Sequence, residues 1–362
     1  MRYKVDPACG KRAYLQLYDQ LREDIVSGLF PFGHKLPSKR LLSEEAGVSV
    51  VTAEHALSLL LEEGYAQSRQ RSGYFVTFRE GEVFSAPSVR PISPSHVQGE
   101  RKGEFPFSVY ARTVRKVLSD WGESLLEKAP AGGCEELKRA LAAYLSRSRG
   151  IVASPEQIVV GSGAEYLYGF VVSLLGKEKI FAIEDPSYRK IQSVYESYGV
   201  TLYRVPLGED GIRSDALKEL SAHALHVTPY RSFPSGVTAT ASKKREYLRW
   251  AEEGKRFLVE DDVESEFTLS RKPEETLFSL SKRENVLYIN TFSRTVSPSL
   301  RVAYMVLPPR FVPLFREKLG FWSCTVPLLE QRVLTELLES GDFERHVNRV
   351  RRRLRRESEK KD

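Results

Sequence analysis

The stretch from Asn290 to Tyr304 holds the side chain of greatest chemical interest in this 362-residue sequence. Apolar runs on either side, one ending at Ile289 and one beginning at Val302, predict two strands joined by a turn rich in serine, threonine and proline. Arg294 lies in that turn. Its guanidinium stays protonated, so it can bind a phosphate or a carboxylate but is a poor nucleophile. A structural role, in which Arg294 only caps a loop, stays open as the alternative.

Two other stretches carry groups that could bind a ligand. The glycines of Gly161-Ser162-Gly163 precede a helical pattern that begins at Ala164, and free N–H groups at such a helix start attract an anion. Five carboxylates crowd the segment from Glu260 to Phe267. Because residues of a strand alternate between its two faces, these carboxylates should not converge, and no cation site is predicted there.

Histidine and cysteine usage gives no sign of a metal site. The six histidines are scattered, and only His223 and His226 lie close together, where core or surface roles are expected. The three cysteines are far apart, which indicates a reducing compartment. No window approaches the about 20 apolar residues of a membrane span, and the N-terminus lacks the apolar core of an export signal. The expected location is the cytoplasm, with no membrane partner.

Helical and strand patterns alternate through the middle of the chain and predict the elements that position these groups. An α/β domain with a largely parallel sheet is the expected fold. The predicted helices are Glu135–Arg147, Ala164–Leu175, Tyr188–Tyr198 and Lys243–Glu253. The predicted strands are Gln157–Val160, Lys179–Ile183, Leu202–Val205, Ala224–Val227, Phe257–Glu260 and Val286–Ile289.

The first 79 residues predict a second, different unit. Helical patterns cover Ala13–Ser27, a short segment from the cap Ser38 to Ala46, and Val50–Glu63. Two short strand patterns, Tyr65–Ser68 and Tyr74–Thr77, follow around a basic turn. The tight Gly-Val-Ser turn between the last two helices is typical of a helix-turn-helix, whose second helix enters a DNA major groove.

Four motifs follow one another in this unit: Leu-Pro-Ser-x-Arg, Gly-Val-Ser, Glu-Gly-Tyr and Ser-Gly-Tyr-Phe-Val. In their order and spacing the unit resembles the GntR winged helix. The resemblance implies binding to double-stranded DNA. It implies contacts to the phosphate backbone and the grooves from a set of residues in the helices and the wing: Ser38, Arg40, Ser49, Thr52, Arg69, Arg71 and Gly73.

Two positions depart from that pattern, because Val50 and Glu54 stand where family members often have arginines. Val50 could contact a thymine methyl but cannot read guanine, so an operator that leans towards A·T pairs is expected. The acids of the unit nearly cancel its bases, so a three-helix fold that binds a protein stays open as the alternative.

The rest of the chain resembles fold-type I pyridoxal-phosphate enzymes, in the form found in MocR-type members of the GntR superfamily. Motifs at Gln157–Glu165, Glu184–Tyr188, Thr228–Gly236, Glu260–Phe267 and Thr291–Arg294 carry the resemblance. It implies that Asp261 pairs with the pyridine nitrogen of pyridoxal phosphate and that Arg301 holds the phosphate. The implied cofactor site comprises Gly163, Ala164, Tyr188, Asp261, Ser293, Arg294 and Arg301.

Three changes around the implied ring argue against catalysis. Arg294 replaces the lysine that forms the Schiff base, Val263 replaces a tyrosine, and Arg231-Ser232 replaces a His-Gln pair. Family members also continue for about a hundred residues beyond the helix that contains His346, roughly one small domain. The resemblance therefore implies a catalytically inactive domain without covalent cofactor, and leaves noncovalent binding of pyridoxal phosphate open.

These observations predict four segments: a winged helix over residues 1–79, a linker over 80–106, an aminotransferase-like domain over 107–342 and a basic helix or tail over 343–362. Much of the net charge of +7 lies in the last segment, where a solvated face or frayed tail is expected. The expected function is that of a dimeric transcription regulator with a small anionic effector. The alternatives are a sensor or enzyme that retains noncovalent pyridoxal phosphate, and a gene remnant whose large domain folds poorly.

Overall fold

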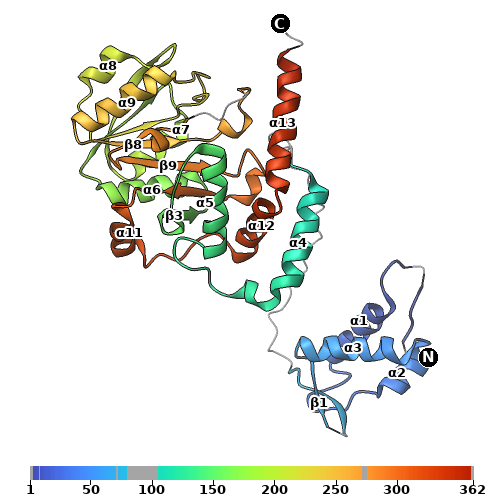
Figure 1. Cartoon of the computed structure of the whole chain (residues 1–362). Helices are drawn as coiled ribbons and strands as arrows, with labels where there is room; N and C mark the ends of the chain where they lie inside the picture. The colour runs from blue at the N-terminus through green and yellow to red at the C-terminus, as the bar shows by residue number, and fades with distance from the viewer. Residues whose placement is uncertain (1–2, 8, 71, 80–104, 271–274, 360–362) are drawn as a thin grey trace. The chain divides into compact units, whose positions relative to one another are not determined.

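A computed structural model describes residues 3–7, 9–70, 72–79, 105–270 and 275–359 of the chain (Figure 1). The chain divides into two units, Met1–Gln98 and Gly99–Asp362. Residues 80–104 of the predicted linker lie outside the described residues. Its last two residues belong to the large unit, because Phe105 is buried and Pro106 caps the next helix. Within the described ranges, no helix has the length and apolar character to cross a bilayer.

The N-terminal unit is a winged helix. Helices α1 (Ala13–Val26), α2 (Lys39–Ala46) and α3 (Val50–Glu62) precede an antiparallel hairpin of β1 (Ala66–Arg69) and β2 (Gly73–Val76). The predicted helices and strands are therefore confirmed, with ends shifted by one residue or so. Leucines and alanines of all three helices form one core.

Serines begin the last two of these helices as predicted. The Ser38 hydroxyl accepts a hydrogen bond from Leu41 N at 3.3 Å, and the Ser49 hydroxyl accepts one from Thr52 N at 3.1 Å. Gly47 ends α2 in the left-handed region, with φ +67°, where a side chain would be strained. This short turn fixes the path from α2 into α3.

The described part of the large unit is built on an eight-stranded sheet of order β3-β10-β9-β8-β7-β4-β5-β6. The five strands from β9 to β5 in that order are parallel, whereas β10 is antiparallel to both its neighbours and β6 is antiparallel to β5. The strands are β3 (Ile158–Gly161), β4 (Ile180–Asp185), β5 (Thr201–Gly208), β6 (Gly211–Ile212), β7 (Ala224–Val227), β8 (Phe257–Asp261), β9 (Val286–Thr291) and β10 (Ala303–Val306). The predicted mostly parallel α/β fold is confirmed.

Helices cover both faces of this sheet, as the alternating apolar residues of the strands require. One face packs against α5 (Glu135–Arg149) and α12 (Leu328–Glu339), and at its other end against α8 (Ser214–Glu219) and α9 (Ala241–Glu253). The opposite face packs against α6 (Ala164–Leu175), α7 (Arg189–Ser197) and α11 (Phe311–Leu319). The pattern analysis had not predicted α8, α11, α12 or the helix α4 (Phe107–Trp121).

The basic C-terminal segment forms helix α13 (Asp342–Ser358), which Figure 1 shows in red beside α4 and α12. Its buried stripe is Phe343, His346, Val347 and Val350. Arg351 Nε donates to the Glu266 carbonyl at 2.5 Å, and Arg355 donates to the Leu269 and Ser270 carbonyls. Of the two predicted alternatives, the basic helix with a solvated face is present over residues 343–358, where several arginines are exposed. The other alternative, a frayed tail, is wrong there, since the helix is anchored along its opposite face.

Candidate functional site

The start of α2 offers a free cation on the winged-helix surface. Arg40 is exposed and forms no hydrogen bond or ion pair with a described residue. Its neighbour Lys39 is engaged, because its ammonium lies 2.6 Å from Glu54 Oε1 of the recognition helix α3. The hydroxyls of Ser38 and Ser49 cap their helices, and Thr52 Oγ1 lies 2.8 Å from Ser49 Oγ.

The backbone around Lys35, just before α2, pairs with strand β2 of the wing. Lys35 pairs with Phe75 in an isolated bridge, and a Cβ on Gly73 would meet Lys35 Cε at 3.1 Å. Gly73 also has φ +109°, which a side chain would strain. The Arg69 guanidinium lies over the Phe75 ring, 4.5 Å from its centroid. Arg71 lies outside the described residues. The DNA contacts assigned to all these residues stay predictions.

The second candidate site lies at the end of β8, where Asp261 is buried. Tyr168 of α6 donates a hydrogen bond to Asp261 Oδ2, and His226 Nε2 lies 3.5 Å from the same oxygen. Tyr195 Oη and His226 Nδ1 are 2.8 Å apart, which fixes the imidazole. Asp261 Oδ1 is buried and has no hydrogen-bond partner among the described residues. One oxygen of this carboxyl is thus held by the protein, and the other is available to an outside donor.

A glycine loop and an arginine form an anion-binding arrangement at the start of α6. Gly163 precedes the helix with φ +99°, and a Cβ there would lie 2.9 Å from Arg301 Cζ. Only glycine lets the guanidinium come this close. Arg301 Nη2 lies 2.6 Å from Glu165 Oε2, and Lys190 Nζ lies 3.1 Å from Glu165 Oε1. Two cations therefore share one carboxylate next to the free N–H groups of the helix start, which begins at Ala164.

The turn between β9 and β10 places Arg294 in an ion pair with Glu264. The Arg294 side chain is 49% exposed, so water and small solutes reach it. The neighbouring Ser293 hydroxyl lies 2.9 Å from Thr291 Oγ1. Tyr188 is partly exposed, and its ring meets the Phe233 ring edge-on at 5.9 Å. The two strands predicted on either side of the turn are confirmed, while the role of each residue stays a prediction.

The residues of these two sites bear on pyridoxal phosphate, the group that the fold implies. They fit its phosphate and its pyridine nitrogen, because Arg301 overlies Gly163 and Asp261 Oδ1 is a buried acceptor that no described residue satisfies. They do not fit a covalent attachment at the turn after β9, because the guanidinium of Arg294 is no nucleophile.

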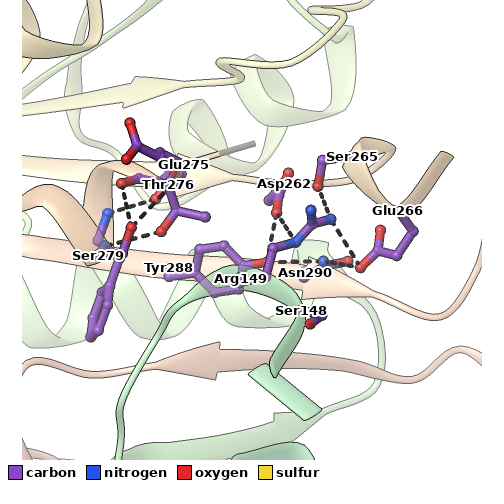
Figure 2. Close-up of polar contacts among 12 residues, drawn as sticks. Ser148, Arg149, Asp262, Ser265, Glu266, Glu275, Thr276, Ser279, Tyr288 and Asn290 are labelled. Atoms are coloured by element: carbon purple, nitrogen blue, oxygen red, sulfur yellow. Dashed lines mark hydrogen bonds and ion pairs between the residues drawn. The ribbon is translucent and has the colours of Figure 1, made fainter. Parts of the chain in front are cut away.

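A buried ion cluster on the opposite face of β8 was missed by sequence reasoning (Figure 2). Arg149, the last residue of α5, lies 3.2 Å from Asp262 Oδ2 and 3.4 Å from Glu266 Oε1, and it donates to Ser265. Tyr288 donates to Asp262 at 2.7 Å. Burial disfavours the charge of Arg149, but the two carboxylates outweigh it and raise its pKa. Burial raises the pKa of Glu266.

The acidic run therefore splits between the two faces, as strand alternation predicts. Glu260 accepts hydrogen bonds from Leu277 N and Phe278 N at 2.8 and 2.9 Å, on the face away from Asp261. Within the described residues, no group of three or more potential metal ligands comes together. His226 is a buried neighbour of Asp261, whereas His223 accepts a hydrogen bond from Ile180 N at 3.0 Å. No local sequence signal marks Arg149, since its partner Ser265 lies 116 residues along the chain.

Comparison with known proteins places both units. Residues 13–76 match the family of bacterial regulatory proteins, gntR family, and residues 103–360 match aminotransferase class I and II. The uncharacterized HTH-type transcriptional regulator YdeL of Bacillus subtilis (strain 168) is 31% identical over 95% of this chain and 77% of that protein. The probable rhizopine catabolism regulatory protein MocR of Rhizobium meliloti is 30% identical over 93% of this chain and 74% of that protein.

Solved structures agree with the fold of the large unit. LysN, an α-aminoadipate aminotransferase from Thermus thermophilus, shares 28% identity with a TM-score of 0.62, covering 69% of this chain and 64% of that one. An archaeal alanine:glyoxylate aminotransferase shares 23% identity with a TM-score of 0.62, covering 67% of this chain and 62% of that one. The chain thus spans less than two thirds of either enzyme's length. It belongs to the MocR-type GntR regulators, which join a GntR helix-turn-helix domain to an aminotransferase class I and II domain.

Proposed function

We propose that this chain regulates transcription by binding double-stranded DNA through its winged helix. The observation that carries the proposal is the capped start of α2, where Arg40 is exposed and has no acidic partner among the described residues. A cation without an internal partner can neutralise a phosphate at little cost. The naming of its relatives as HTH-type transcriptional regulators supports the same role.

The test measures how DNA binding by the full chain depends on salt. Duplexes recovered from a random pool serve as the probe, and binding is followed by gel shift at several salt concentrations. Arg40→Ala should weaken binding to all of them and reduce the slope of log K against log salt by about 1. Arg204→Ala removes an exposed arginine from the large unit and should change neither quantity. An unchanged slope for Arg40→Ala would remove this contact from the proposal.

A second proposal concerns the large unit, which we infer to bind pyridoxal phosphate noncovalently and to lack transaminase activity. When bound, this cofactor supplies an electron sink at its ring. In this chain Asp261 would accept a hydrogen bond from the ring nitrogen, and Arg301 with the Gly163 loop would hold the phosphate. The buried Asp261 Oδ1, for which the described residues offer no donor, favours this proposal. The half-exposed Arg294 and Arg301 would also suit a small anionic effector.

Visible absorbance before and after borohydride treatment tests that inference. Saturable binding without a reducible adduct is expected for the unchanged chain. Arg294→Lys should gain an adduct at residue 294, because an amine then stands where the relatives of this fold hold theirs. Arg283→Lys, at an exposed position elsewhere in the unit, should gain none. A lysine adduct in the unchanged chain would show that another amine has taken over and would contradict the proposal.

We further propose that the large unit forms a homodimer, as the resemblance to fold-type I enzymes implies. Light scattering coupled to size-exclusion chromatography gives the mass directly. A mass of twice 41.1 kDa is expected, and a single-chain mass would exclude this role.

A further inference from the structure

The first two turns of the recognition helix α3 present an unusual surface for a DNA reader. Val51 is 74% exposed and Val50 is 39% exposed. Both stand directly after the cap Ser49, at the end of the helix that a helix-turn-helix presents to base edges. Exposed β-branched apolar residues at this point cost solubility and add nothing to the core of the unit, which the buried Ala53, Ala56, Leu57 and Leu60 supply.

Three polar side chains of the same two turns contact other residues of the winged helix. Thr52 Oγ1 lies 2.8 Å from Ser49 Oγ, and Glu54 Oε1 lies 2.6 Å from Lys39 Nζ. His55 stacks on Tyr14 of α1, with ring centroids 4.0 Å apart and planes 13° from parallel. Thr52 and Glu54 are therefore paired within the chain, and His55 is fixed by stacking with its ring nitrogens left available by the described residues, while the two valines remain exposed.

Apolar side chains distinguish base pairs in the major groove through one group only, the C5-methyl of thymine. A valine cannot form the bidentate hydrogen bonds by which arginine reads guanine. We propose that Val51, assisted by Val50, selects the operator by contact with thymine methyl groups. This inference rests on the proposed function, since it requires that α3 enters the major groove.

The magnitude of the effect follows from the size of a methyl group. Burying one methyl against an apolar side chain changes affinity about fourfold, equivalent to about 0.8 kcal/mol. The selected sites should therefore share one or more T·A pairs at fixed positions. Replacing such a thymine by uracil removes only the methyl and leaves base pairing and backbone unchanged, so it isolates the contact.

The experiment uses the full chain and one duplex recovered by selection from a random pool. Binding is measured by fluorescence anisotropy for the duplex and for versions with uracil at each shared thymine in turn. The unchanged protein should bind at least one uracil version about fourfold more weakly. Val51→Ala should reduce this discrimination markedly, leaving only the smaller contribution of Val50. Val152→Ala, which shortens an 85% exposed valine in the large unit, should keep the full discrimination.

The outcomes separate this inference from the function on which it rests. Binding that ignores uracil at every position, or discrimination that survives Val51→Ala undiminished, would overturn the methyl contact and leave DNA binding in place. A pool that yields no bound duplex at low salt would overturn the proposed function, and the methyl contact with it. In that case the exposed valines would form a surface for a protein partner.

Discussion

Asp261 and Asp262 are neighbours at the end of β8 and are both buried, yet their surroundings differ completely. Asp262 has a full cation, Arg149, at 3.2 Å and a hydrogen bond from Tyr288. Asp261 has a tyrosine hydroxyl and an imidazole beside one oxygen, whereas no described residue donates to the other. The two carboxylates face opposite sides of the sheet, as alternation along a strand requires.

Under the proposed function, Asp262 is a buried carboxylate that stabilises the fold, whereas Asp261 is one that binds a ligand. A charge that the fold itself must carry is matched by a counter-charge from the same chain, because leaving it unmatched costs several kcal/mol. A carboxylate that binds a ligand needs an open acceptor but no counter-charge from the chain, and the proposed function assigns this role to Asp261 Oδ1.

The largest effect is expected from Arg149→Met, which keeps the length of the side chain and removes its charge. Asp262 and Glu266 would then be buried without a counterion, and the large unit should lose about 3–5 kcal/mol of unfolding free energy. Urea denaturation followed by tryptophan fluorescence measures this selectively, because Trp121, Trp250 and Trp322 all belong to the large unit.

The matched control for that change is Arg147→Met, two residues earlier in the last turn of α5. Arg147 pairs with Glu344 at 2.8 Å, but its side chain is 57% exposed. An exposed pair contributes about 0–1 kcal/mol, so this variant should unfold close to the unchanged chain. Equal losses for the two variants would mean that burial of the pair around Arg149 does not matter.

A smaller effect, dependent on pH, is expected at Glu184 of β4, which is buried. Burial raises the pKa of Glu184 to about 8 from its ordinary 4.5. A hydrogen bond from Ser232 Oγ at 2.5 Å lowers this pKa but does not outweigh burial. The folded state therefore keeps a proton that the unfolded state releases above pH 4.5. Stability from this group falls as pH rises from about 4.5 towards 8.

Glu184→Gln isolates this contribution, because the amide keeps the shape without titrating. The free energy of unfolding of the unchanged chain, minus that of this variant, should decline by a few kcal/mol between pH 5 and pH 8. The slope should be about 1.4 kcal/mol for each pH unit. Urea midpoints at four or five pH values provide the measurement, and the exposed Glu178→Gln serves as control. A difference that stays constant with pH would show that Glu184 is ionised throughout.

Sequence patterns predicted the parts of this fold whose signals are local. Both ends of helix α6 were predicted correctly, since its apolar sequence is bounded by Gly163 and Gly176. Both ends of β7 were also predicted correctly. Helix α4 was missed because only Thr113 and Val117 are buried along its 15 residues, too few to form a stripe. Helix α12 follows a stretch without a clear cap, as Pro327 stands at its start with no side-chain hydrogen bond.

The candidate site divides in the same way. Motif resemblance indicated Asp261, Gly163 and Arg301, whose surroundings the structure then supplied. The Arg149 cluster was not predicted, since its partner Ser265 lies 116 residues away and only the fold brings the two together. Tyr168 and His226 were missed as neighbours of Asp261 for the same reason.

The smallest effect on stability is expected from Asp261→Asn, and it is the sharpest test of the comparison. Asn can still accept the hydrogen bond from Tyr168, and no arginine or lysine loses its partner. The free energy of unfolding, measured with urea, should therefore change by less than about 1 kcal/mol. The same change removes the charge that would hold a protonated ring nitrogen, and pyridoxal phosphate should bind about tenfold more weakly, since a hydrogen bond to a charged group contributes about 1.5–3 kcal/mol. A large loss of stability with unchanged binding would instead make Asp261 a structural residue like Asp262.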